Sequence, residues 1–119
     1  MTKIIGTGVD IVEIRRIREM AKKNPRFLKR VFSAEEVAYA YKGLKWAERL
    51  AVRFAAKEAV WKALGHDDVA LSSIAVTRMA SGKPTIDLSR LKVPKNWVAE
   101  VALSHCDEYA IAHCIIYER

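Results

Sequence analysis

Glu58 and the cations beside it have the residue types and spacing that most directly suggest chemistry. Glu58 follows Lys57 and precedes Lys62 by four residues, inside the helix-like segment LAVRFAAKEAVWKALG at residues 50–65. Magnesium typically takes one or two protein carboxylates and fills its other positions with water and substrate phosphate oxygens. Glu58 is therefore a candidate magnesium ligand, and an ordinary i,i+4 ion pair with Lys62 is the alternative.

Asp10 is the best candidate for a second carboxylate. It ends the apolar segment IIGTGV, which contains two glycines, and it precedes a segment with helical spacing. A side chain at such a junction can reach across to another element. The alternative role is the N-cap of the following helix, where Asp10 and Glu13 resemble a capping box. The two roles are compatible.

Arg53 and Lys57 lie where a helix should present apolar side chains. At about 100° per residue the segment has one apolar stripe, and both cations project onto its flank rather than its solvent side. The stripe consists of Leu50, Phe54, Trp61 and Leu64. A cation held against a packed surface is costly unless an anion neutralises it. We therefore expect an anion at this face of the helix.

Two further groups are weaker candidates. The turn formed by Ser81, Gly82, Lys83 and Pro84 could hold a phosphate through its backbone amides and the lysine, or could simply join two strands. Ser104 and His105 could bind a ligand or transfer a proton, or form an ordinary strand end. No Ser/His/Asp or Cys/His set has a recognisable spacing, and no GxxxxGK[ST] loop is present.

The charge of the chain favours an anionic partner. Its net charge is +7, from 21 Lys and Arg against 14 Asp and Glu. Nucleic acid, a phosphorylated small molecule, an anionic membrane and an acidic protein all fit this charge, and solubility alone is the alternative. Residues 15–30 contain eight cations and a single acid, Glu19. Such a segment can dock an acidic helix or a phosphate backbone, or can be a solvated face.

The elements that position these residues follow from hydrophobic spacing and turn signals. We expect a short strand up to Asp10, a helix up to Asn24, a short turn opened by Pro25, and a helix over residues 37–41 after a Ser33 capping box. A long helix over residues 45–64 should end at Gly65. Two strand pairs should follow, at residues 74–79 with 84–88 and at 97–105 with 109–117.

This order of strand, helices and then strands predicts an α+β fold, in one domain over residues 1–119. No run of about 18 apolar residues and no signal segment is present, so we expect a cytoplasmic protein without a membrane partner. Cys106 and Cys114 lie eight residues apart in one hairpin, a poor geometry for a disulfide. We expect both thiols to be reduced.

Five motifs together resemble a known family. GTGVDIVEIRRI, FLKRVFSAEEVAY, RFAAKEAVWKALG, SGKPTI and LSHCDEYAIA occur in this order and cover nearly the whole chain. They resemble the signatures of the holo-acyl-carrier-protein synthases, the small bacterial 4′-phosphopantetheinyl transferases. The resemblance implies the fold of that family and transfer of 4′-phosphopantetheine from coenzyme A to a serine of apo acyl carrier protein. It also implies release of adenosine 3′,5′-bisphosphate, a magnesium cofactor and a role in fatty acid biosynthesis.

The resemblance also assigns roles to the candidate residues. Asp10 and Glu58 match the two metal ligands, and Lys62 matches a lysine that helps proton transfer or the leaving phosphate. The positions implied to bind coenzyme A are Arg53, Lys57, Gly82, Lys83, Pro84, Ser104 and His105. The base that activates the carrier serine stays open between Glu58, Lys62 and a metal-bound water.

A homotrimer with active sites between subunits is a further implication. One protomer would contribute Asp10 and Glu58, and its neighbour the hairpin residues. Arg16 and Arg26 match positions that grip the acidic helix of the carrier protein. The sequence departs from the family at Val52, where glycine is common, and at Thr7, where isoleucine is common. Neither departure is expected to touch the chemistry.

Two other functions are compatible with the composition. A basic nucleic-acid-binding module would lose affinity for oligonucleotides steeply with salt. A magnesium-dependent nucleotide hydrolase would consume coenzyme A without a carrier protein. The resemblance favours the transferase, with no nucleic-acid partner.

Overall fold

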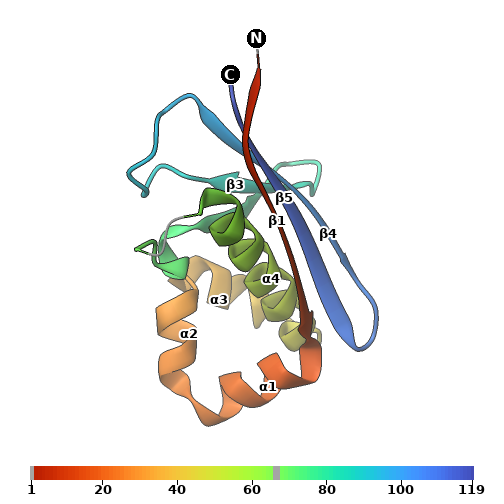
Figure 1. The fold of residues 1–119 in the computed structure, drawn as a ribbon. Helices are drawn as coiled ribbons and strands as arrows, with labels where there is room; N and C mark the ends of the chain where they lie inside the picture. Colours follow the sequence, from red (N-terminus) through yellow and green to blue (C-terminus); the bar gives the residue numbers. More distant parts are fainter. Residues whose placement is uncertain (1, 66–67) are drawn as a thin grey trace.

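The computed structural model describes residues 2–65 and 68–119, and it has the predicted α+β architecture (Figure 1). The helices are α1 (Ile14–Lys23), α2 (Pro25–Val31), α3 (Ala34–Ala40), α4 (Trp46–Leu64) and the 3₁₀ turn η1 (Leu71–Ser73). The strands are β1 (Lys3–Glu13), β2 (Ala75–Arg78), β3 (Pro84–Asp87), β4 (Trp97–His105) and β5 (Tyr109–Glu118). None of the described helices is both long and apolar enough to cross a membrane.

β5 is the central strand of an antiparallel sheet with the order β1-β5-β4. Asp10 of β1 lies opposite Ala112 of β5, and Leu103 of β4 lies opposite the same residue. β2 and β3 form a separate hairpin, whose β3 strand packs beside β4. Both predicted strand pairs are therefore confirmed.

α4 packs across the three-stranded sheet, and small residues allow the two to approach closely (Figure 1). The buried positions of α4 include six alanines, at 47, 51, 55, 56, 59 and 63. β5 presents Ala110, Ala112 and Cys114 to the interior, all without exposed surface. α1, α3 and β2 cover other sides of α4, and Phe27 of α2 packs on its Phe54. This helix is therefore buried around most of its circumference and has no single apolar stripe.

The first strand is longer than predicted. β1 continues through Glu13, which pairs with Tyr109, and the Ile14 amide then donates to the carbonyl of Glu108 at 2.8 Å. Ile11 is consequently a strand residue with 63% of its surface exposed rather than part of the helix. The predicted Asp10 capping box is wrong, because α1 begins after Glu13 and has no side-chain cap. Ladder hydrogen bonds with β5 override the local helical spacing.

Other local predictions are confirmed. Ser33 and Glu36 form the capping box of α3, in which the Ser33 hydroxyl accepts from the Glu36 amide at 3.1 Å and Glu36 Oε1 accepts from the Ser33 amide at 2.8 Å. Gly65 ends α4 in the left-handed conformation, with φ of 71°. Cys106 and Cys114 are free thiols, and burial, with a smaller effect of Glu100, raises the pKa of Cys114 to about 12.

Candidate functional site

The two predicted metal ligands lie on neighbouring elements, Asp10 on β1 and Glu58 on α4. Lys62, one turn beyond Glu58, reaches across to β1. Its ammonium donates to Asp10 Oδ1 at 3.2 Å and to the carbonyl of Val9 at 3.0 Å. Lys62 thus pairs with Asp10 and ties the long helix to the first strand.

Glu58 and Asp10 interact electrostatically. The pKa of Glu58 is raised, first by burial and second by the negative charge of Asp10, while Lys62 opposes the shift. Two carboxylates that repel each other in this way favour a cation between them. Among the described residues no third His, Cys, Asp or Glu completes a metal-binding group. The pair fits magnesium, which takes its remaining ligands from water and phosphate oxygens.

Two glycines bring these carboxylates together by letting β1 touch the backbone of α4. A Cβ added to Gly6 would lie 2.1 Å from the carbonyl oxygen of Ala63, and one added to Gly8 would lie 2.0 Å from that of Ala59. Gly8 is two residues from Asp10, and Ala59 is the neighbour of Glu58. The contact therefore sets how far the strand carboxylate lies from the helix carboxylate.

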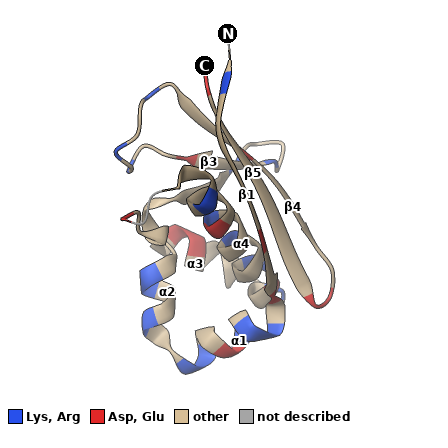
Figure 2. Cartoon of the chain, viewed as in Figure 1, with Lys and Arg blue, Asp and Glu red and all other residues tan. Residues whose placement is uncertain are grey.

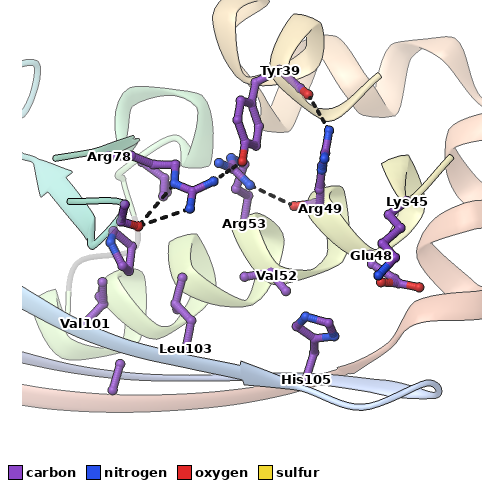
Figure 3. A pocket seen from close by; sticks show the side chains of 14 residues that line it. Tyr39, Lys45, Glu48, Arg49, Val52, Arg53, Arg78, Val101, Leu103 and His105 are labelled. Carbon is purple, nitrogen blue, oxygen red and sulfur yellow. Dashed lines mark hydrogen bonds between the residues drawn. The ribbon is translucent and has the colours of Figure 1, made fainter. Parts of the chain in front are cut away.

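A second candidate region is a cavity of about 460 Å³ between α3, α4, the β2–β3 hairpin and β4 (Figure 3). Four of the predicted coenzyme A residues line it: Arg53, Gly82, Pro84 and His105. Val52, one of the two departures from the family pattern, lines it as well. The structure places residues from five elements, α3, α4, β2, β3 and β4, around one cavity.

Sequence reasoning missed five polar residues of this cavity. These are Tyr39, Lys45, Glu48, Arg49 and Arg78. The sequence pattern around Tyr39 predicts only a short helix, and the pattern around Arg78 predicts only a strand. Arg49 lies one turn before Arg53 on α4, and that i,i+4 spacing is the signal that could have identified it. The pKa of Arg53 is lowered, mainly by burial and further by Arg49, while Glu36 opposes the shift.

Lys83 and Ser104 do not line this cavity in the single chain. The Lys83 ammonium lies 3.6 Å from Glu100 Oε2 on β4, and both side chains are more than half exposed. Ser104 is exposed on β4, one residue before His105. Both side chains are exposed to solvent and therefore accessible to a ligand.

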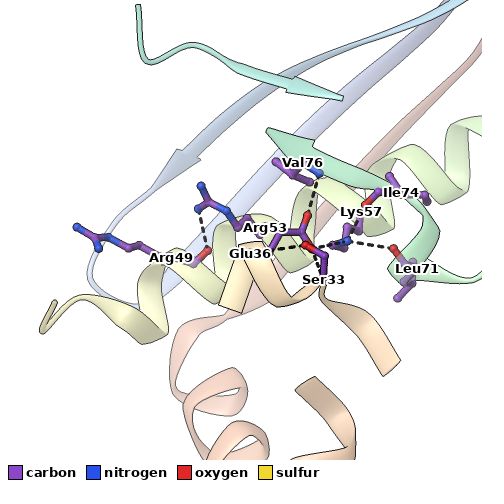
Figure 4. A network of polar contacts seen from close by, with 8 residues as sticks. All are labelled: Ser33, Glu36, Arg49, Arg53, Lys57, Leu71, Ile74 and Val76. Atoms are coloured by element: carbon purple, nitrogen blue, oxygen red, sulfur yellow. Dashed lines mark hydrogen bonds and ion pairs between the residues drawn. The ribbon is translucent and has the colours of Figure 1, made fainter. Parts of the chain in front are cut away.

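Lys57 corrects the sequence interpretation. Its side chain has no exposed surface, and its ammonium lies 2.8 Å from Glu36 Oε1 (Figure 4). It also donates to the carbonyls of Leu71 at 3.1 Å and Ile74 at 2.6 Å. The anion expected beside Lys57 is therefore an internal carboxylate, and the prediction that Lys57 binds a phosphate is wrong.

The sequence did not predict Glu36 as this partner, because the capping box already accounts for a glutamate at position 36. One carboxylate oxygen accepts from the Ser33 amide, while the other accepts from the Val76 amide at 2.8 Å. Burial lowers the pKa of Lys57, and the contact with Glu36 opposes that shift. The pair joins α3, α4 and β2 in the interior.

The basic N-terminal segment is an exposed surface. Arg16 on α1 and Arg26 on α2 are both exposed, among further Lys and Arg residues on these helices (Figure 2). Arg26, Lys29 and Arg30 together line a shallow hollow. This arrangement suits an acidic partner surface.

An apolar surface covers the outer face of the sheet. Val9 and Ile11 on β1 are 54% and 63% exposed, and Ile111, opposite Ile11 on β5, is 41% exposed. These side chains alternate with the inward-facing Gly8, Val12, Ala110 and Ala112. Exposed apolar faces of this kind often mark protein interfaces.

Comparisons with known proteins identify the family. The model of the 4′-phosphopantetheinyl transferase superfamily matches residues 6–114. A holo-[acyl-carrier-protein] synthase of Clostridium tetani is 39% identical, over 95% of each chain. One of Clostridium kluyveri is 42% identical, over 95% of this chain and 90% of that protein. The crystal structure of a holo-(acyl-carrier-protein) synthase from Bacillus anthracis, in complex with CoA (3′,5′-ADP), has a TM-score of 0.82 at 31% identity and covers 98% of both chains. The family read from the sequence motifs is confirmed, and the chain belongs to the 4′-phosphopantetheinyl transferase superfamily.

Proposed function

We propose that this chain is a holo-[acyl-carrier-protein] synthase, which transfers 4′-phosphopantetheine from coenzyme A to a serine of apo acyl carrier protein and so supports fatty acid biosynthesis. The observation that carries the proposal is the combination of a carboxylate pair and an arginine-lined cavity around one helix, α4. The Bacillus anthracis relative, with a TM-score of 0.82, is a synthase in complex with CoA (3′,5′-ADP). A carboxylate pair with a separate cationic cavity suits a substrate that contains both a pyrophosphate and a nucleotide.

The transfer breaks one phosphoanhydride bond and forms one phosphodiester. The serine oxygen attacks the phosphorus attached to pantetheine, and adenosine 3′,5′-bisphosphate leaves. Glu58 and Lys62 are the catalytic residues that we assign. Burial first and the charge of Asp10 second raise the pKa of Glu58, which makes its carboxylate a stronger proton acceptor than an ordinary glutamate. Lys62 places its ammonium 3.2 Å from Asp10, where it can offset negative charge on the leaving group.

Magnesium is the cofactor that we propose, held by Asp10 and Glu58. When bound, it would neutralise charge on the phosphoanhydride. The supporting observation is the mutual repulsion of the two carboxylates. Magnesium binding should therefore raise the melting temperature of the protein. This rise should be lost in Asp10→Asn and Glu58→Gln, and an unchanged response in both variants would exclude the site.

A complete active site requires, in this proposal, two neighbouring chains of a homotrimer. Asp10 lies on β1 and the arginine-lined cavity lies over β4, and β5 runs between these two strands. The two halves therefore occupy opposite edges of the sheet. The exposed apolar face with Val9, Ile11 and Ile111 offers a surface for assembly. A second copy can then bring its cavity beside the first copy's carboxylates.

The carrier protein is proposed to dock on α1 and α2 through Arg16 and Arg26. Both are exposed in a basic region, and an acidic helix is the complementary surface. Gly82, Lys83, Pro84, Ser104 and His105 are kept as proposed contacts of coenzyme A. Lys57 is not among them, because its ammonium is enclosed by protein groups.

One experiment tests the reaction directly. Purified protein is incubated with coenzyme A, magnesium and apo acyl carrier protein, and intact-mass spectrometry follows the carrier. We expect one phosphopantetheine increment on a single serine, and none on a carrier whose serine is replaced by alanine. Coenzyme A consumed without a modified carrier would indicate a hydrolase instead. No increment with any divalent metal would overturn the proposal.

A further inference from the structure

The ring of Tyr39 lies at the centre of three guanidinium groups (Figure 3). The Cζ atom of Arg53 is 4.2 Å from the ring centroid, that of Arg49 is 5.1 Å away and that of Arg78 is 5.4 Å away. These three arginines come from α4 and β2, and Tyr39 comes from α3. All four residues line the same cavity.

Polar contacts of Tyr39 fix two of these arginines. Its backbone carbonyl accepts from Arg49 Nη1 at 3.3 Å, and its hydroxyl oxygen accepts from Arg78 Nη1. Arg78 also donates from Nε and Nη2 to the carbonyl of Gly82, at 3.2 and 3.1 Å, which holds the turn of the β2–β3 hairpin. Arg53 donates to the carbonyl of Arg49 at 3.4 Å. The cluster is therefore constrained at each member.

None of the three arginines forms a close ion pair within the described residues, although Glu36 interacts with Arg53 over a longer distance and Glu48 also lines the cavity. Within residues 2–65 and 68–119, no carboxylate oxygen lies within 4.0 Å of a nitrogen of Arg49, Arg53 or Arg78. The pKa of Arg53 is lowered by burial; Glu36 opposes this shift, and repulsion from Arg49 adds to it to a smaller extent. The electron-rich face of Tyr39 attracts guanidinium groups and so counteracts this repulsion. The charged residues that line the cavity are Lys45, Arg49, Arg53 and Arg78 against the single carboxylate of Glu48, so an excess of positive charge faces it.

From these contacts we propose that Tyr39 is a positioning residue, which gathers Arg49, Arg53 and Arg78 into a preorganised site for a phosphomonoester. Guanidinium groups match phosphate oxygens through paired hydrogen bonds. A phosphomonoester carries close to two negative charges at neutral pH, whereas each phosphate of a pyrophosphate diester carries one. Three clustered cations therefore favour the monoester.

This inference rests on the proposed function, because coenzyme A carries one phosphomonoester, on the 3′ oxygen of its ribose. Tyr39 then acts as a determinant of specificity. The enzyme should discriminate between coenzyme A and 3′-dephospho-coenzyme A, and the discrimination should depend on the aromatic ring at position 39. Binding through the carboxylate pair is independent of this ring.

The test compares Tyr39→Leu, which removes the ring, with Tyr39→Phe, which removes only the hydroxyl. We expect Tyr39→Leu to reduce the preference in kcat/KM for coenzyme A over 3′-dephospho-coenzyme A by about tenfold, equivalent to about 1.4 kcal/mol. Tyr39→Phe should keep most of the preference, and KM for the carrier protein should not change in either variant. Tyr41 provides the matched control, because its ring stacks on Trp46 with centroids 5.0 Å apart, whereas the cation–π contacts of the three arginines are made with Tyr39. Tyr41→Leu should retain the preference.

A purely structural role for Tyr39 predicts a different result. In that case Tyr39→Leu lowers kcat/KM for both substrates by the same factor, which would overturn the proposal. Calorimetric binding of adenosine 3′,5′-bisphosphate and adenosine 5′-monophosphate to the wild type and Tyr39→Leu provides a readout without turnover. This binding measurement tests the role of Tyr39 independently of turnover. If the wild type transferred no phosphopantetheine, that result would refute the proposed function but not the role of Tyr39. If Tyr39→Leu does not fold, Tyr39→Gln takes its place, and equal binding of the bisphosphate by wild type and variant would refute the role.

Discussion

Replacing Gly8 with alanine should separate the two carboxylates while leaving both in the sequence. The added Cβ would lie 2.0 Å from the carbonyl oxygen of Ala59 and 2.9 Å from the amide nitrogen of Ala63. Ordinary van der Waals contact begins at 3.4 Å, so the distance from the added Cβ to the Ala59 oxygen is about 1.4 Å too short. Both opposing atoms belong to the α4 backbone, and no side chain can rotate away. β1 or α4 must therefore move by about 1 Å.

The size of the effect follows from that movement. Overpacking of an interior contact costs about 1–3 kcal/mol of unfolding free energy. A displacement of about 1 Å between catalytic groups can reduce turnover by about 100-fold. We expect Gly8→Ala to lower the urea midpoint accordingly and to lose most phosphopantetheine transfer in the mass-spectrometric assay. The loss of turnover should persist at urea-free, low-temperature conditions where the variant is fully folded.

Gly43→Ala is the matched control. Its added Cβ would meet nothing closer than Arg49 Nη1 at 3.8 Å, and its backbone lies outside the left-handed region. Its unfolding free energy should be unchanged or raised by up to about 1 kcal/mol, because alanine restricts the unfolded chain. Native-like stability and turnover in Gly8→Ala would refute the argument that backbone contact sets the position of Asp10.

Three further changes test other parts of the structure. Lys57→Met should lower the free energy of unfolding in urea by about 3–5 kcal/mol, because it leaves Glu36 buried without its cation. Adding Glu36→Gln should restore part of this loss, and a double variant without any restored stability would contradict a coupled pair. Because the pKa of Glu58 is raised in the folded protein, this residue favours folding most below its ordinary value of 4.5, and the contribution is lost as the pH rises through the raised pKa. Without magnesium, the melting temperature of Glu58→Gln should therefore gain on that of the wild type as the pH rises above 4.5. A parallel pH dependence would exclude the shift. Arg16→Glu or Arg26→Glu should raise KM for the carrier protein at least several-fold with little change in KM for coenzyme A, and equal changes would argue against docking on these helices.

Local signals in the sequence were sufficient for much of the fold. The Ser33 capping box, the Gly65 helix end and both strand pairs depend on residues close together in the chain. The end of β1 could not be read in this way. The register of its partner strand, more than 90 residues later, decides whether residues 11–13 are strand or helix.

In the candidate site, too, the features that the sequence did not predict depend on residues far apart in the chain. The geometry that relates Asp10 to Glu58 depends on the contact of Gly6 and Gly8 with the α4 backbone, which no local pattern records. Helical periodicity correctly indicated an anion near Lys57, but this anion is the carboxylate of Glu36, 21 residues earlier in the chain. A buried lysine and a ligand-binding lysine have the same sequence pattern when the partner is distant in the chain.

The placement of the carboxylates and the cavity on opposite edges of the sheet has a consequence for mixed assemblies. In the proposed trimer, each cleft takes its metal ligands from one chain and its arginine cluster from the neighbour. Two inactive variants, one lacking Glu58 and one lacking Arg53, then carry defects that a neighbour can complement. After random exchange in equal amounts, about one cleft in four would receive both intact halves. Two dead proteins would together recover about a quarter of the activity, whereas a site built within one chain would recover none.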